Sequence, residues 1–136
     1  MTVGSIKENI NIERRVAITL ESAKNIIALG LNINLEKNYA NHLGINDKQF
    51  EELGVRFYDS SSEVIDNSRL LLKVNCPSDE EIKSLKEKTI LVGIFNPTKN
   101  ENKLKEILKK KISIFSLELL PRISRAQSMD VLSSQS

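Results

Sequence analysis

The stretch LLLKVNCPSDEEIKSLKEKTILVGIF, residues 70–95, decides the fold class, because it holds two short apolar runs on either side of a helical pattern. The first run, Leu70 to Val74, is apolar except for Lys73, and the second, Thr89 to Phe95, is apolar after Thr89 and rich in β-branched residues. Such runs are typical of parallel strands buried on both faces of a sheet. Between them, Pro77 to Asp79 can open a helix. The stretch therefore predicts a strand, a helix and a second, parallel strand.

The same alternation extends in both directions along the chain. Short apolar or alternating runs predict further strands at residues 2–4, 31–36, 55–58 and 112–117. Polar capping residues predict helices that begin near Thr19, at Asn46 or Asp47, at Ser60 or Ser61, and from about Asn100. Core-facing positions are expected at Ala23, Ile26, Ile27 and Leu29 in the first helix and at Leu104, Ile107 and Leu108 in the last. The pattern predicts an α/β fold: a doubly wound parallel sheet of the Rossmann or flavodoxin-like type.

Length and composition restrict the class of protein. A chain of 136 residues suffices for one domain with its own core. Its net charge of +2, with basic and acidic residues nearly balanced, gives no support for a nucleic-acid-binding surface, which needs a concentrated basic face. The only basic cluster, Lys109 to Lys111, is interpreted as the solvated end of a helix, where cations are favourable. The apolar runs are far shorter than the ~20 residues that a membrane-spanning helix needs. Residues 1–11 lack the apolar stretch of a signal peptide.

The chain lacks the usual phosphate-binding motifs. Its five glycines are too far apart to form a G-x-G-x-x-G loop, and there is no P-loop. Pro121 marks a boundary. Residues 1–121 are predicted to form the domain, whereas residues 122–136 are polar and rich in serine.

Few single side chains in the domain indicate chemistry. His42, without evident partners, is interpreted as a surface residue. Cys76 is the only cysteine, which excludes an internal disulfide and a multi-cysteine metal site, and we predict no metal site. It is interpreted as a small, partly buried residue in a reducing, cytosolic setting. Arg15 and Lys73 are both expected near the carboxyl ends of strands, where doubly wound sheets bind ligands. Together they could hold an anion, or each could form a salt bridge.

The tail after Pro121 is rich in groups that make directed hydrogen bonds. Gln127 and Asp130 are three residues apart, so a helical turn would bring them near one face. A guanidinium, an amide and a carboxylate suit a ligand that carries an amide and hydroxyls, such as a nicotinamide riboside. The residues alone are equally compatible with a solvated terminal segment.

Three motifs of this chain resemble one family. The tail PRISRAQSMDVLSSQS, residues 121–136, is similar to the signature loop of the NAD(H)-binding component of proton-translocating NAD(P) transhydrogenases. The segment ERRVAIT, Glu13 to Thr19, resembles an "E-x-R-V-A-x-T" motif that this component shares with alanine dehydrogenases, and Lys7-Glu8 fits the "K-E" that precedes it. The segment LKVNCP, Leu72 to Pro77, resembles the family's "LKVNAP". The tail motif is long and specific, whereas the other two are shared with the wider superfamily.

The resemblance implies a component with two doubly wound domains and NAD(H) in the cleft between them. This chain would be the N-terminal domain only, and the Gly-rich fingerprint would belong to a second domain beyond it. Arg122, Gln127 and Asp130 would reach the nicotinamide end of the nucleotide, with Ser133 as a further contact. Their neighbours along the same nucleotide would be Ile123, Ser124, Ser128 and Met129.

The resemblance also implies the reaction and its partners. Hydride would pass from NADH directly to NADP⁺ on a separate component, so no catalytic acid or base is expected. A membrane component would translocate protons. The chain is therefore expected to be cytoplasmic and peripheral to the inner membrane through its partners, in a full component that is a homodimer. Without the second domain, the chain alone is expected to be inactive.

Two alternatives remain open. In an alanine dehydrogenase-like enzyme, Arg15 and Lys73 would hold the substrate, and a catalytic histidine would follow the fifth strand. Asn96 stands about where that histidine would be, and an amide does not exchange a proton near neutral pH. The second alternative is a non-catalytic domain that serves in assembly.

Overall fold

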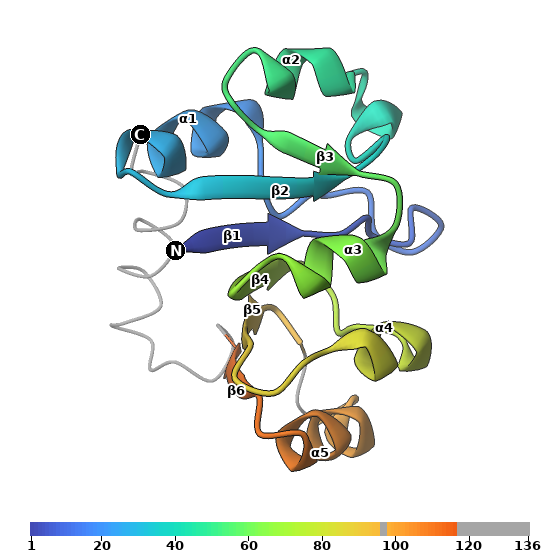
Figure 1. Ribbon diagram of the computed structural model, residues 1–136. Helices are drawn as coiled ribbons and strands as arrows, with labels where there is room; N and C mark the ends of the chain where they lie inside the picture. Colours follow the sequence, from blue (N-terminus) through green and yellow to red (C-terminus); the bar gives the residue numbers. More distant parts are fainter. Residues whose placement is uncertain (96–97, 117–136) are drawn as a thin grey trace, which may run out of the picture.

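The computed structural model describes residues 1–95 and 98–116 (Figure 1). The tail residues named above and Asn96 therefore lie outside the described residues. The strands are β1 (Thr2–Ser5), β2 (Asn32–Glu36), β3 (Arg56–Tyr58), β4 (Leu70–Lys73), β5 (Ile90–Gly93) and β6 (Ser113–Ser116). The helices are α1 (Leu20–Ala28), the short 3₁₀ turn η1 (Asn41–Leu43), α2 (Asp47–Glu51), α3 (Ser61–Asp66), α4 (Asp79–Ser84) and α5 (Glu101–Lys109).

The strands form one parallel sheet in the order β3-β2-β1-β4-β5-β6, which is the strand order of the Rossmann fold. Helices lie on both faces. One apolar cluster joins the sheet to α3, α4 and α5, and a second joins it to α1 and α2. Figure 1 shows α4 and α5 on the same side of β4, β5 and β6. The predicted α/β, doubly wound parallel sheet is confirmed.

Side-chain caps start four of the helices. Thr19 begins α1, and the open choices are settled as Asn46 for α2 and Ser60 for α3. Ser78 begins α4. Each cap side chain accepts a hydrogen bond from the backbone N–H three residues later, which satisfies one donor at the helix start.

Two predictions about helix ends are wrong, and a third, the solvated lysine cluster, is confirmed for Lys109 and Lys111 but not for Lys110. Leu29 is 67% exposed because α1 ends one residue before it, so its side chain lies beyond the packed face. Leu108 is 57% exposed because α5 turns Ile107 inward, and the next residue points about 100° away. Lys110 is more than a solvated helix end, since its Nζ donates to the carbonyl oxygens of Ile82 and Lys83 at 2.6 and 3.1 Å. It thereby caps the C-terminus of α4.

Candidate functional site

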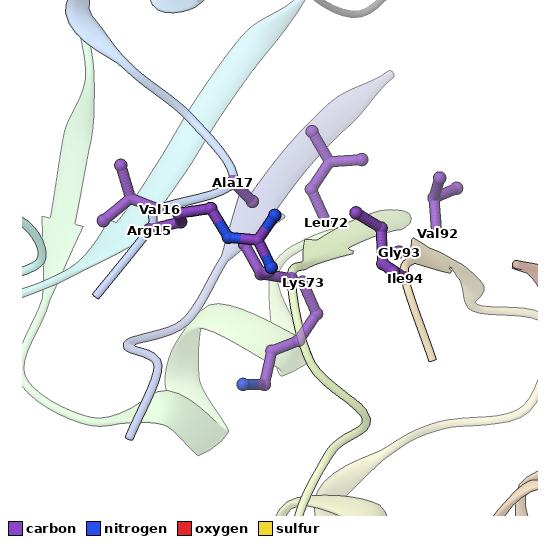
Figure 2. Close-up of a pocket in the computed structure, with 9 residues that line it drawn as sticks. Arg15, Val16, Ala17, Leu72, Lys73, Val92, Gly93 and Ile94 are labelled. Atoms are coloured by element: carbon purple, nitrogen blue, oxygen red, sulfur yellow. The ribbon is translucent and has the colours of Figure 1, made fainter. Parts of the chain in front are cut away.

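The carboxyl edge of the sheet is hollowed beside the point where the strand order reverses, between β1 and β4. A cavity of about 200 Å³ lies there (Figure 2). Its walls come from the loop before α1, the end of β4 and the end of β5: Arg15, Val16, Ala17, Leu72, Lys73, Val74, Val92, Gly93 and Ile94. The structure therefore brings Arg15 and Lys73, the two predicted anion-binding residues, to one cavity.

A buried tyrosine holds the loop that carries Arg15. The hydroxyl of Tyr39 lies 2.7 Å from Oγ of Ser5 and accepts the backbone N–H of Ile18 at 3.1 Å. Ser5 in turn donates to the carbonyl oxygen of Leu72 at 2.6 Å. Burial raises the pKa of Tyr39 above its ordinary range, so the hydroxyl stays protonated and can donate to Ser5. This chain of bonds ties the loop end to β1 and β4, the two strands that flank the switch point.

A second pair of bonds fixes the outer part of the loop. A guanidinium nitrogen of Arg14 donates to the carbonyl oxygen of His42 at 3.0 Å, and Nε2 of His42 lies 2.7 Å from the carbonyl oxygen of Arg14. His42 is therefore partly covered and has a positioning contact, which the prediction of a plain surface residue missed. It lies on η1, and it does not line the cavity.

Lys73 is part of a buried ion pair. Its Nζ lies 2.8 Å from Oε1 of Glu8, and their side chains are 4% and 0% exposed. The Glu8 carboxylate also accepts the backbone N–H groups of Val74 at 2.8 Å and Asn75 at 3.2 Å. In Figure 2 the amino group of Lys73 points away from Arg15. The charge of Lys73 is thus balanced within the protein, and its alkyl chain forms part of the cavity wall.

Arg15 is paired differently, at the surface. Its Nε and one guanidinium NH₂ donate to the two oxygens of Glu13, each at 2.8 Å, and its backbone N–H donates to Glu13 at 2.9 Å. The side chain of Arg15 is 68% exposed. The hydrogen bonds from Arg15 lower the pKa of Glu13 to about 2, so the carboxylate is ionised at neutral pH. The Arg15 guanidinium therefore carries its charge at the cavity, where it is already paired with the carboxylate of Glu13.

Cys76 lies away from this cavity, in a polar hollow of about 470 Å³ that Lys73 also lines. Its half-buried state agrees with the prediction of a partly buried residue. Burial raises the pKa of its thiol, with smaller opposing effects from Lys103 and Lys73. The thiol is thus a weak nucleophile at neutral pH.

Sequence reasoning placed Glu8 and Glu13 in family motifs but missed their roles as partners of Lys73 and Arg15, and it missed Tyr39 altogether. One signal could have revealed Glu8, because a lysine predicted inside a buried strand requires a carboxylate nearby. That carboxylate is expected after a neighbouring strand at the same sheet edge, and Glu8 follows β1. Tyr39 had no comparable signal, since its burial depends on how the segment between β2 and α2 packs.

The described residues supply only a small share of a nucleotide site. A cavity of about 200 Å³ is below the ~300–1,000 Å³ of sites that enclose a drug-sized ligand, so it suits a single ring or a small anion. At its floor Gly93 allows close packing, because a Cβ there would overlap the carbonyl oxygen of Lys73.

Within residues 1–95 and 98–116 there is no cluster of side chains that could hold a metal ion. No helix in those same ranges is long and apolar enough to cross a membrane.

Comparisons with known proteins identify a family and several relatives of this chain. The family described as "Alanine dehydrogenase/PNT, N-terminal domain" matches residues 4–136. The chain is 34% identical to a Rickettsia prowazekii protein whose name gives it as a portion of NAD(P) transhydrogenase subunit alpha, over all of this chain and 37% of that protein. It is 28% identical to an alanine dehydrogenase of Methanococcus maripaludis, over 93% of this chain and 34% of that enzyme.

A solved structure also relates this chain to transhydrogenases. The crystal structure of a transhydrogenase from Sinorhizobium meliloti superposes with a TM-score of 0.87 at 34% identity, and covers 98% of this chain and 40% of that chain. The chain thus spans between 26% and 40% of the length of the transhydrogenase proteins that it matches. By its motifs, its fold and its match from residue 4 to residue 136, the chain belongs to the family of alanine dehydrogenase/PNT N-terminal domains.

Proposed function

We propose that this chain is the N-terminal region of the NAD(H)-binding component of a proton-translocating transhydrogenase. The bound nucleotide supplies the hydride, which passes from NADH to NADP⁺ held by a partner component. A second domain completes the NAD(H) site, and a membrane component couples the reaction to proton translocation. Alone, this chain is inactive.

One observation carries this proposal: the similarity to transhydrogenase proteins spans the whole chain, tail included, at 34% identity. The similarity to the alanine dehydrogenase is lower and covers less of the chain. The tail is also where the nucleotide-contacting residues of the proposal lie. These are Arg122, Gln127 and Asp130 at the nicotinamide end, Ser133 beside them, and Ile123, Ser124, Ser128 and Met129 along the nucleotide.

The described residues fit a supporting role in such a site. They form one rigid edge of the cleft, with the loop of Arg15 tied to β1 and β4 through Tyr39. At the cavity they present the exposed guanidinium of Arg15, which suits a phosphate or carboxylate group of a ligand that can compete with Glu13. Direct hydride transfer requires the protein to hold two rings in position and to exclude water from the contact between them. A rigid edge contributes to both.

The test is calorimetric titration of NADH into this chain, with and without the separately expressed downstream region of the Rickettsia prowazekii relative. We expect binding only in the presence of that region, and we expect Arg122→Gln to weaken it by about ten-fold or more, as for the loss of a charge-assisted hydrogen bond. Arg125→Gln is the matched control, since it removes the same charge from the same segment. Absence of binding in both mixtures would refute the cofactor site and favour the assembly domain.

An alanine dehydrogenase-like function makes a different prediction. It requires a carboxylate substrate such as pyruvate to bind between Arg15 and Lys73. Lys73 is, however, neutralised by Glu8 at 2.8 Å in a buried position. Pyruvate binding that depends on Lys73, together with NADH-dependent turnover in the reconstituted mixture, would favour that function over transhydrogenation.

A further inference from the structure

One face of the sheet is only half covered by helices. On the side of α1 and α2, the parallel register aligns a row of side chains across the strands: Leu35, Ser5, Leu72, Val92 and Phe115. Leu35 is buried, and Leu72 packs against the apolar cluster that joins the sheet to α1 and α2. Val92 and Phe115 belong to neither apolar cluster of the described residues. The cover supplied by α1 and α2 therefore ends near β4.

The uncovered part of this face is apolar. It comprises Ile90 and Val92 on β5, Ile94 just after that strand, and Phe115 on the edge strand β6, and we call these four residues the bare face. Phe115 is 57% exposed and Ile94 is 37% exposed. Helices α4 and α5 lie on the other side of these strands (Figure 1). Since parallel sheets are normally covered on both faces, a bare apolar face of this kind marks a docking surface.

The composition of the bare face determines the chemistry of its partner. All four side chains are hydrocarbon, so a complex is stabilised by the removal of apolar area from water. The partner therefore has to present apolar side chains rather than a charged patch. Val92 and Ile94 also line the cavity of Arg15 (Figure 2). A partner that packs on the bare face consequently reaches the edge of that cavity.

The longer relatives contain a region that can supply this partner. The matching family is an N-terminal domain, and this chain covers only 37% of the Rickettsia prowazekii protein and 40% of the Sinorhizobium meliloti chain. More than half of each of these proteins therefore lies outside the matched domain, in the same polypeptide. A region tethered in this way has an effective concentration in the millimolar range, well above that of a second copy of the domain in dilute solution.

We propose that the bare face is the surface on which the downstream region of the transhydrogenase component packs, through apolar side chains of its own. This inference rests on the proposed function, because it takes that region as the partner. It adds the place where the two parts meet, which is the face of β5 and β6 that carries Phe115. The downstream region would then adjoin the cavity of Arg15, since Val92 and Ile94 belong to both surfaces.

Hydroxyl-radical footprinting read by mass spectrometry tests this contact without nucleotide. The chain is oxidised alone and with an excess of the separately expressed downstream region of the Rickettsia prowazekii relative. Phe115 and Leu108 give a matched comparison, because both side chains are 57% exposed but lie on β6 and on α5. We expect the oxidation of Phe115 to fall several-fold when the region is added, whereas the oxidation of Leu108 stays unchanged.

Variants show whether the contact contributes to association. In calorimetric titration of the region into the chain, Phe115→Ser should weaken binding by about ten-fold or more, as for the loss of an aromatic side chain buried at an interface. Phe115→Leu keeps an apolar side chain and should weaken binding less. Leu108→Ser is the matched control and should leave the affinity unchanged. Circular dichroism of each variant checks that the fold is retained, which we expect because both positions are exposed.

Several outcomes would overturn this docking surface. It is refuted if the region does not associate with the chain, if Phe115 stays as reactive in the mixture as alone, or if Leu108→Ser acts as Phe115→Ser does. Protection of Phe115 that rises with the concentration of the chain alone would also refute it, because a second copy then covers the face.

The NADH titration separates this inference from the proposed function. NADH binding in a mixture in which Phe115 stays reactive would support the cofactor site and overturn the docking surface. Association that depends on Phe115 but brings no NADH binding would support the docking surface and overturn the cofactor site.

Discussion

Replacing Glu8 with glutamine should destabilise the fold strongly. Glu8 is fully buried, and its carboxylate accepts three donors: Nζ of Lys73 at 2.8 Å and the backbone N–H groups of Val74 and Asn75 at 2.8 and 3.2 Å. Glutamine keeps one acceptor oxygen but turns an NH₂ group toward at least one of these donors. It also leaves the Lys73 ammonium buried, with Glu81 as its nearest remaining carboxylate at 4.0 Å.

The size of the effect follows from the burial of both partners. Removing one member of a buried ion pair costs about 3–5 kcal/mol, because the other charge stays buried without compensation. That is a large share of the ~5–15 kcal/mol that stabilises a typical domain. For a chain of this length it corresponds to a fall in Tm of roughly 10 °C or more. Lys73→Met in the same chain removes the stranded charge, and the double variant should recover roughly half or more of the loss.

Urea unfolding followed by circular dichroism measures these free energies by linear extrapolation. The matched control is Glu101→Gln, since Glu101 pairs with Lys105 at 3.2 Å but both side chains are about two thirds exposed. That exposed pair should contribute no more than about 0.5 kcal/mol. A loss below about 1 kcal/mol for Glu8→Gln would refute the reasoning. So would a double variant that is no more stable than the single one, because the cost would then come from something other than the stranded lysine.

Three further predictions concern the neighbouring residues. In an NMR titration Glu13 should have a pKa of about 2, and Arg15→Gln should move it back toward the ordinary 4.5. Because the folded pKa is lowered, the stabilisation by this pair is present above pH 4.5 and is lost as the pH falls toward 2. Cys76 should react with iodoacetamide at neutral pH more slowly than cysteine in a short peptide, because burial raises its pKa, and a faster reaction would contradict that burial. Gly93→Ala should cost about 1–3 kcal/mol in urea unfolding, because its Cβ would meet the backbone carbonyl of Lys73, which cannot turn aside, and a neutral result would show that β4 and β5 can shift apart.

The order of elements could be predicted from the sequence because each strand and helix has a local pattern of its own. The run from Leu70 to Val74, apolar except for Lys73, contains β4, and the capping threonine at residue 19 begins α1. The errors at Leu29 and Leu108 have a common origin. Periodicity identifies a helix face, but where the helix stops and which flank meets the sheet depend on packing partners elsewhere in the chain.

The site was harder to predict for the same reason. That Arg15 and Lys73 share a cavity follows from the rule that strand ends converge at one edge of a parallel sheet. Their partners do not follow from that rule. Glu13 is only two residues from Arg15, yet Glu8 is sixty-five residues from Lys73 and meets it only because β1 and β4 are neighbours in the sheet. Sequence patterns locate charged residues, whereas the pairing of the charges depends on the order of the strands.

That pairing assigns different roles to two cations that look alike in the sequence. An anion that enters the cavity can compete with Glu13 for Arg15 at a modest cost, because the guanidinium is largely exposed. Displacing Glu8 from Lys73 would cost several kcal/mol, because neither charge has access to water. Arg15 is therefore the group that can respond to a ligand. Lys73 shapes the wall of the cavity and, through Glu8, holds the ends of β1 and β4 together.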